Sequence, residues 1–266
     1  MTVLHAFILG LVQGITEILP ISSSAHLVII PWLFKWHYQG LAFDISLHFG
    51  TALAFTAYFF KDWIDLLKAA FTKTKTDKKS LFWYILIATV PAAVAGLLLE
   101  KYAETVFRAP VVMAIGLLVF AVLLWLADHF GKRALPLERI GFSAALTIGL
   151  AQILALIPGV SRSGVTITAG LFKGFTREAA ARFSFLIATP IMVAAAGLNF
   201  LKLRPGDLNM VFFTGVVTSA VSGFVAIRLL LNYVKRSSMN VFVFYRIALA
   251  IFILLLILSR TGMRSI

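Results

Sequence analysis

Apolar residues fill long stretches of this chain, and polar residues are confined to short segments between them. Six stretches approach or reach the roughly 20 residues that a helix needs to cross the hydrocarbon core of a bilayer. The pattern therefore predicts six membrane-spanning helices. They cover about residues 44–60, 81–99, 111–127, 179–201, 210–232 and 241–259.

Two further apolar regions, about 3–34 and 141–176, are interrupted by clusters of Pro, Gly and Ser. Neither half of an interrupted region is long enough to span a bilayer comfortably. Non-helical backbone at membrane depth is tolerated only where protein or a wet cavity surrounds it. Both regions are therefore predicted to be re-entrant helix–loop–helix hairpins.

The composition supports an integral membrane protein of the all-α class. Of 266 residues, 61% are hydrophobic and 13% charged, and the mean hydropathy is +0.96, whereas soluble domains carry about 25% charged residues. Cysteine is absent, which excludes disulfides and thiolate metal sites. The net charge of +13 lies mostly in short loops. This pattern favours membrane topology and contact with anionic lipid over nucleic acid binding.

The loop charges also predict an orientation. The loop 61–80 contains six lysines and is expected in the cytoplasm, together with loop 128–139 and Lys235-Arg236. The loops 100–109 and 202–209 are then expected outside. This assignment makes the first hairpin open to the outer face of the membrane.

The two halves of the chain resemble each other. Gly10-Leu-Val-Gln13 matches Gly149-Leu-Ala-Gln152, and a Pro and a Ser cluster follow in both halves. Phe43–Leu47 matches Phe183–Ile187 at an offset of 140 residues. Each half, about 1–130 and 140–260, would contain one hairpin and three spans, so the second half enters from the opposite face. A single membrane domain of interlocked inverted repeats is predicted, with the hairpins meeting near the midplane; chance similarity between apolar segments is the alternative.

The first hairpin contains a polar tract. Gln13 and Glu17 are four residues apart and share one helix face. Pro20 then ends the helix. The loop that follows presents Ser22, Ser23, Ser24 and His26. Helix capping would account for one serine, and His26 could be a buried core histidine. A carboxylate at membrane depth is a functional candidate, and the tract offers an acid, a nucleophile and a base.

The second hairpin contains Pro158-Gly-Val-Ser161-Arg162-Ser163-Gly-Val-Thr166. A helix starting near Ser163 would aim free N–H groups into the loop, and helix N-termini bind phosphate. A guanidinium matches phosphate in bidentate geometry. The predicted phosphate clamp comprises Ser161, Arg162, Ser163 and Thr166. The alternative is a structural arginine paired with a buried carboxylate such as Glu17, and both interpretations can hold in the empty site.

Other polar residues carry weaker signals. Asp44 and His48 flank the start of a span, and His48 is interpreted as structural. Tyr245-Arg246 lies early in the last span, where snorkelling would explain the arginine. Arg177, Glu178 and Arg182 are interpreted as interface charges at a helix start.

These tracts resemble the undecaprenyl-diphosphatase, or bacitracin-resistance, family of bacteria. That family carries an (E/Q)-x-x-x-E pattern followed by a Pro, a Ser pair and a His, and then a P-G-x-S-R-S-x-x-T pattern. Both occur here in order, and the hydropathy matches over nearly the whole chain. The matching residues are Gln13, Glu17, Pro20, Ser22, Ser23 and His26, then Pro158, Gly159, Ser161, Arg162, Ser163 and Thr166.

The resemblance implies six spans and two re-entrant hairpins in inverted repeats, often as a homodimer. It also implies hydrolysis of undecaprenyl diphosphate in the bacterial inner membrane, with a divalent cation, Mg²⁺ or Ca²⁺. The first motif position is Gln13, which is the non-acidic variant. Glu17 is therefore the one acidic metal ligand that we expect.

The expected chemistry combines both tracts. Arg162 and the surrounding hydroxyls would stabilise phosphate charge, joined by Gln13 and Ser22. Ser23 is the candidate nucleophile and His26 its base or the leaving-group acid. Activation of water by His26 or Glu17 is an open alternative. A secondary transporter or lipid flippase is the alternative function, because inverted repeats with broken helices are typical of transporters.

Overall fold

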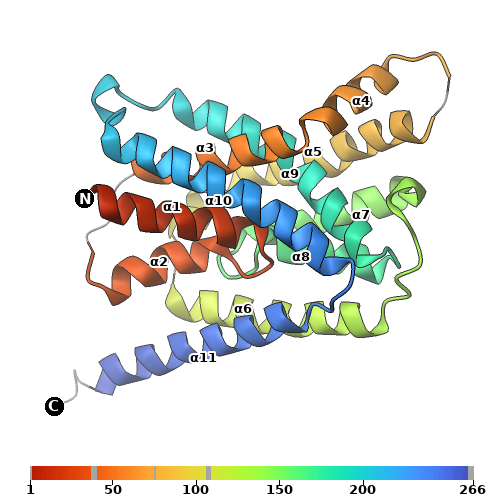
Figure 1. The fold of residues 1–266 in the computed structure, drawn as a ribbon. Coiled ribbons are helices and arrows are strands. Elements are labelled where there is room, and N and C mark those ends of the chain that lie inside the picture. Colours follow the sequence, from red (N-terminus) through yellow and green to blue (C-terminus); the bar gives the residue numbers. More distant parts are fainter. Residues whose placement is uncertain (1, 37–40, 75, 106–108, 263–266) are drawn as a thin grey trace.

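The computed structural model describes residues 2–36, 41–74, 76–105 and 109–262, and all its long elements there are helices (Figure 1). Within the described residues, the single turns η2 (Leu137–Arg139), η3 (Leu154–Leu156) and η4 (Pro205–Asp207) connect longer helices. The α-helices are α1 (Val3–Ile18), α2 (Ser23–Leu33), α3 (Leu41–Tyr58), α4 (Phe60–Ala70), α5 (Asp77–Thr105), α6 (Pro110–Phe130), α7 (Phe142–Ile153), α8 (Arg162–Phe172), α9 (Arg177–Phe200), α10 (Met210–Val234) and α11 (Asn240–Gly262).

Five of these helices are long and apolar enough to cross a membrane. They are the candidate spans within α5, α6, α9, α10 and α11. The sixth predicted span corresponds to α3, an 18-residue helix that is not among them. Asp44, Ser46, His48 and Thr51 lie along α3 and lower its hydropathy. The chain is thus a multi-pass membrane protein, while six spans stay a prediction.

Both interrupted regions form two short helices joined by a break, as the sequence predicts. The first is α1–α2, broken at residues 19–22, and the second is α7–α8, broken around η3 and residues 157–161. In Figure 1, α1 starts at the left of the molecule, whereas α7 lies at the right. Their breaks meet in the interior, because the Ser163 hydroxyl of the second pair bonds to the Leu19 carbonyl of the first.

Small residues let the helices around this meeting point pack closely. A Cβ at Gly14 in α1 would lie 1.9 Å from the Ser222 Oγ atom and 2.6 Å from the Gly223 nitrogen in α10. No side chain fits there, so the backbones of α1 and α10 approach as small-residue interfaces in membranes do. Hydroxyls support the contact between α10 and α3, since Ser219 donates to the Leu47 carbonyl at 2.7 Å.

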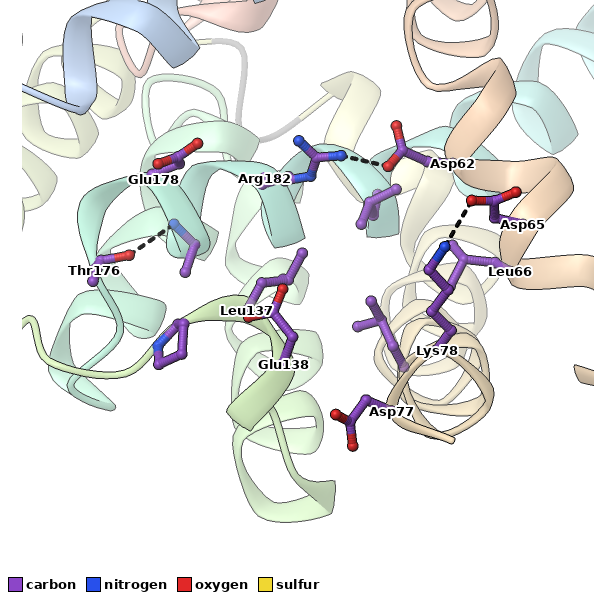
Figure 2. A pocket seen from close by; sticks show the side chains of 14 residues that line it. Asp62, Asp65, Leu66, Asp77, Lys78, Leu137, Glu138, Thr176, Glu178 and Arg182 are labelled. Atoms are coloured by element: carbon purple, nitrogen blue, oxygen red, sulfur yellow. Dashed lines mark hydrogen bonds and ion pairs between the residues drawn. The ribbon is translucent and has the colours of Figure 1, made fainter. Parts of the chain in front are cut away.

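The basic loops predicted in the cytoplasm gather at one end of the molecule. The predicted loop 61–80 is partly wrong, because residues 60–70 form α4 and α5 begins at Asp77. Lys61 and Lys68 lie on α4, and Lys78 and Lys79 lie in the first turn of α5, so a high density of lysines did not indicate a loop here. Figure 2 shows α4, α5, η2 and the start of α9 around a pocket of about 560 Å³. Its ion pairs include Arg182 with Asp62 and Lys78 with Asp65.

The charges interpreted as interface residues are paired at this end. Arg177 Nε lies 2.5 Å from Asp128, whose second oxygen accepts from the Met239 N–H at 2.9 Å. Lys235 lies 3.2 Å from Glu178. These bonds fasten the ends of α6, α9, α10 and α11 together.

Candidate active site

Two serines with unusual backbone conformations mark the breaks in the two helix pairs. Ser22 has φ 73° and Ser161 has φ 69°, and each is the residue immediately before a helix, α2 and α8. Few non-glycine residues adopt positive φ, and such strain clusters at functional sites. The first N–H groups of a helix have no partner within the helix. Two helix N-termini therefore approach the same region of the protein interior, where they favour an anion.

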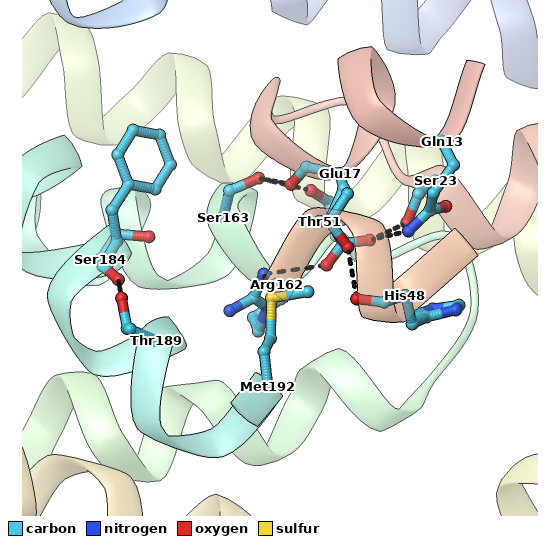
Figure 3. A network of polar contacts seen from close by, with 12 residues as sticks. Gln13, Glu17, Ser23, His48, Thr51, Arg162, Ser163, Ser184, Thr189 and Met192 are labelled. Atoms are coloured by element: carbon cyan, nitrogen blue, oxygen red, sulfur yellow. Dashed lines mark hydrogen bonds and ion pairs between the residues drawn. The ribbon is translucent and has the colours of Figure 1, made fainter. Parts of the chain in front are cut away.

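An ion pair joins the two polar tracts across this region (Figure 3). Arg162 Nη2 lies 2.8 Å from Glu17 Oε1, with both side chains largely buried. The Arg162 guanidinium also lies 5.4 Å from the centre of the Phe55 ring. Its other terminal nitrogen, Nη1, is buried and has no hydrogen-bond partner. The sequence-based alternative of a carboxylate partner is thus confirmed, and the guanidinium keeps one donor free for a ligand.

Ser23 and Gln13 share the second oxygen of Glu17. Ser23 Oγ donates to Glu17 Oε2 at 2.5 Å, and Gln13 Nε2 donates to the same oxygen at 3.2 Å. The carboxylate is therefore the group positioned to take the proton of Ser23. Figure 3 shows Gln13, Ser23 and Arg162 around Glu17.

His26 has partners other than Ser23. Its ring is buried, Nδ1 lies 2.7 Å from the Ser22 carbonyl oxygen, and Nε2 lies 2.6 Å from the Tyr245 hydroxyl. A carbonyl only accepts, so Nδ1 carries a proton and donates. In the neutral ring, Nε2 then accepts from Tyr245. The geometry gives His26 the role of holding the backbone of Ser22, and no bond links it to Ser23.

The second tract divides into pocket residues and supporting residues. Ser161 lines the pocket, and its hydroxyl accepts from the Gly164 N–H at 3.2 Å. Ser163 instead donates to the Leu19 carbonyl at 3.1 Å. Thr166 donates to the Arg162 carbonyl at 2.8 Å and contacts the Ser184 hydroxyl at 2.6 Å. Ser163 and Thr166 therefore stabilise the loop through these hydrogen bonds, and neither lines the pocket.

A polar cavity of about 230 Å³ lies where these groups meet. His48, interpreted as structural, lies in its wall, as does Gln152 of α7. Ser24 and His48 also line a second, mostly apolar cavity of about 420 Å³. The polar cavity thus borders an apolar one. The polar cavity's wall is formed by Thr16, Glu17, Ser22, Ser23, Ser24, His48, Ala92, Gln152, Ala155, Leu156, Ser161, Arg162 and Ile191.

Arg246 corrects an interpretation made from the sequence. It does not snorkel to the membrane surface; it is 0% exposed and surrounded by backbone carbonyls. Its guanidinium donates to five of them at 3.0–3.3 Å. A lone arginine within a span is a functional signal in itself, but its place near a helix end favoured snorkelling. The acceptors are the carbonyls of Pro20, Gly116, Leu117, Gly159 and Val160. Arg246 therefore links the break between α1 and α2 and the break between α7 and α8 to α6.

The site has few acidic groups for a metal ion. Among the described residues, no group of three or more His, Cys, Asp or Glu side chains could hold one. Glu17 is accompanied by the buried Gln13 Oε1 oxygen, which has no partner. Mg²⁺ is commonly held by one or two carboxylates together with substrate phosphates. The oxygens of Glu17 and Gln13 fit a cation bound jointly with a phosphate ligand.

Fold and site define a multi-pass helical membrane protein with a buried polar pocket between two broken helix pairs. A family profile described as "Bacitracin resistance protein BacA" matches residues 6–252. The chain belongs to this bacterial family. It is 48% identical over 260 residues to a protein named undecaprenyl-diphosphatase from Pelotomaculum thermopropionicum, covering 98% of each chain. It is also 48% identical over 250 residues to one of that name from Moorella thermoacetica, covering 94% of this chain and 96% of the relative.

Proposed function

We propose that this protein hydrolyses undecaprenyl diphosphate to undecaprenyl phosphate and inorganic phosphate, recycling the lipid carrier of cell-wall synthesis. The observation that carries the proposal is the cluster of Ser23, Glu17 and Arg162 between two helix N-termini. It combines a hydroxyl, a base and a cation beside a polar cavity. The name undecaprenyl-diphosphatase, carried by relatives that match nearly the whole chain, supports the same substrate.

In the proposed mechanism Ser23 Oγ attacks the terminal phosphorus while its proton passes to Glu17, which already accepts its hydrogen bond. The bond from that phosphorus to the bridging oxygen breaks, and undecaprenyl phosphate leaves. Water then attacks the phosphoserine and the bond between that phosphorus and Ser23 Oγ breaks. Glu17 returns its proton to Ser23 Oγ, and both hydrogens of the water leave with the inorganic phosphate. Direct attack by water on the diphosphate, with Glu17 as base, is the variant that dispenses with the covalent step.

Charge develops on the phosphate oxygens as the anhydride bond breaks. The unpartnered Nη1 of Arg162 is positioned to stabilise that charge, together with N–H groups at the starts of α2 and α8. Ser22 and Ser161 set the backbone that presents these N–H groups. Gln13 keeps Glu17 oriented.

A divalent cation, Mg²⁺ or Ca²⁺, would be held by Glu17 and Gln13 Oε1 and would neutralise charge on the diphosphate. The adjoining apolar cavity supports the placement of the first isoprene units next to the phosphates. Trp32, Trp36 and Phe43 lie in its wall.

We further propose that α3 is the sixth span, that both broken pairs are re-entrant, and that the halves form inverted repeats. The opposite positions of α1 and α7 in Figure 1 support this arrangement. The gathering of basic segments at one end supports a location in the bacterial inner membrane with that end in the cytoplasm. The active site would then open to the outer face. The family resemblance supports a homodimer.

Purified protein in detergent tests the proposed function. With a divalent cation present, it should release phosphate from undecaprenyl diphosphate, and the Ser23→Ala variant should not. Release without a membrane or ion gradient would exclude the alternative of an obligate transporter or flippase. Equal rates for the wild type and Ser23→Ala would contradict the covalent step through Ser23 and favour direct attack by water, and no phosphate release by the wild type would contradict the proposed function.

A further inference from the structure

Buried polar atoms without partners concentrate at the polar cavity. Among the described residues, five buried side-chain N or O atoms have no hydrogen-bond partner. One is Trp63 Nε1. The other four belong to Gln13, Gln152 and Arg162, which line the polar cavity or contact Glu17 in its wall. Buried polar groups in proteins are overwhelmingly paired, so this concentration indicates that the cavity binds a polar ligand.

Gln152 is the most unusual of the three. It is 2% exposed, lies near the end of α7 and lines the cavity, and both its Nε2 and its Oε1 lack partners. Arg162 and Gln13 each make one bond to Glu17 and keep one atom free. Gln152 forms no hydrogen bond through either Nε2 or Oε1.

The sequence repeat explains why Gln152 is left without a partner. Gln13 and Gln152 occupy matching positions in the Gly-Leu-x-Gln segments of the two halves. Four residues after Gln13 stands Glu17, which accepts its hydrogen bond. Four residues after Gln152 stands Leu156, which lines the cavity but has no polar side-chain atom.

A structural role does not account for a fully unpaired amide at this position. An apolar side chain of similar size would fill the same space without the free-energy cost of desolvating two polar atoms. The cost is recovered when a ligand pairs with the amide. The guanidinium of Arg162 in the same wall also has an unpartnered donor, so both free donors suit an anion.

We propose that Gln152 is a substrate-binding residue, whose Nε2 amide group donates to a phosphate oxygen of the diphosphate beside Arg162 Nη1. This inference rests on the proposed function for the identity of the diphosphate. It assigns the second repeat a direct contact with substrate that is independent of the arginine motif.

Two substitutions and one control test the inference on the full-length protein in detergent. Gln152→Met keeps the size and removes both polar atoms, and Gln152→Glu keeps the size but adds negative charge. Thr147→Val is the control, because Thr147 is partly exposed on the same helix and bonds only within it, to the Ser143 carbonyl. The readouts are the melting temperature with and without inorganic pyrophosphate, and kcat and KM for undecaprenyl diphosphate.

Gln152→Met should melt at or above the wild-type temperature without ligand, since it removes two unpaired atoms. Its stabilisation by pyrophosphate should be much smaller than that of the wild type. KM should rise on the order of tenfold, with a smaller change in kcat, as for an interaction present in both the ground and transition states. Gln152→Glu should bind more weakly still, and Thr147→Val should match the wild type.

A lower melting temperature of Gln152→Met, with an unchanged pyrophosphate shift and KM, would show a structural role and overturn the inference. Tight binding of pyrophosphate by Gln152→Glu at raised cation concentration would also overturn the inference, because it would indicate that the side chain at position 152 is a metal ligand. A wild type unaffected by pyrophosphate would also overturn it. A wild type that responds to pyrophosphate through Gln152 but hydrolyses no undecaprenyl diphosphate would refute the proposed function and leave the inference standing.

Discussion

Glu17 and Arg162 are 145 residues apart in sequence, yet Glu17 Oε1 and Arg162 Nη2 lie 2.8 Å apart. Each belongs to a different broken helix pair, so the bond connects the two halves of the chain. The pairing leaves Glu17 Oε2 for Ser23 and Arg162 Nη1 for a ligand. A base and a free cationic donor thus flank the same cavity.

Glu17→Gln should remove activity while keeping the protein folded. The amide oxygen can still accept from Arg162, but an amide cannot take the proton of Ser23 or offer a charged ligand to a cation. General-base catalysis typically contributes about 10²–10⁴-fold, so a loss of that order in kcat is expected. Phosphate release and expression level are the measurements. The companion Gln13→Glu should be tolerated, and wild-type turnover in Glu17→Gln would return Glu17 to a structural role.

Ser23→Ala should lose activity, whereas Ser22→Ala should mainly lose stability. Ser23 donates only to Glu17, so its removal should abolish turnover with little change in stability. Ser22 Oγ accepts from the buried Gly159 N–H at 3.2 Å. Leaving that N–H unpaired costs about 1–3 kcal/mol, so Ser22→Ala should melt at a lower temperature and keep part of its activity. Substantial activity in Ser23→Ala would favour direct attack by water.

Arg246→Met should destabilise the protein severely, because five carbonyls lose their donor. Hydrogen bonds to charged groups contribute about 1.5–3 kcal/mol each, and a total loss of at least about 3 kcal/mol is expected. Arg246→Lys should recover part of this. Arg228→Met, at an exposed position in α10, is the control. Equal melting temperatures for Arg246→Met and Arg228→Met would restore the snorkelling interpretation.

The sequence predicts the fold better than it predicts which side chains form hydrogen bonds with one another. The lengths of the apolar stretches and their interruption by Pro, Gly and Ser located the two broken pairs, because these features act locally on the backbone. A pair between Glu17 and Arg162 was one alternative, because a structural arginine at membrane depth needs a buried carboxylate. The hydrogen-bond partner of Ser23 could not be predicted. His26 is nearer to it in sequence, but the positive φ of Ser22 changes the direction of the chain so that Ser23 bonds to Glu17. Contacts such as His26 with Tyr245, 219 residues apart, depend on tertiary packing alone.

The orientation of the molecule is testable because the chain lacks cysteine. Lys73→Cys lies in the basic segment predicted in the cytoplasm, and Gly206→Cys lies in the connection predicted outside, where a new Cβ meets nothing within 4 Å. In intact cells, an impermeant thiol reagent should label position 206 and spare position 73. After permeabilisation both should react, which controls for access. Labelling at 73 but not at 206 would reverse the topology and place the active site toward the cytoplasm.

Arg162→Lys should keep the protein folded and lose on the order of a hundredfold or more in kcat. Arg162 uses Nη2 for Glu17 and holds Nη1 free, a division that a planar fork permits. A lysine ammonium is a single point charge, and pairing with Glu17 would draw it away from the substrate. Removing one preorganised donor to a developing oxyanion typically costs about 10²–10³ in rate.

Arg177→Lys is the matched control for this substitution. Arg177 also pairs with a buried carboxylate, Asp128, but it lies outside the cavity wall. Its replacement should lower the melting temperature and leave kcat nearly unchanged. If Arg162 only balanced the charge of Glu17, its lysine variant should behave like Arg177→Lys, because an ammonium retains most of that attraction. Near-normal kcat in Arg162→Lys would therefore remove the phosphate-binding role of Arg162 and weaken the hydrolytic mechanism proposed for this site.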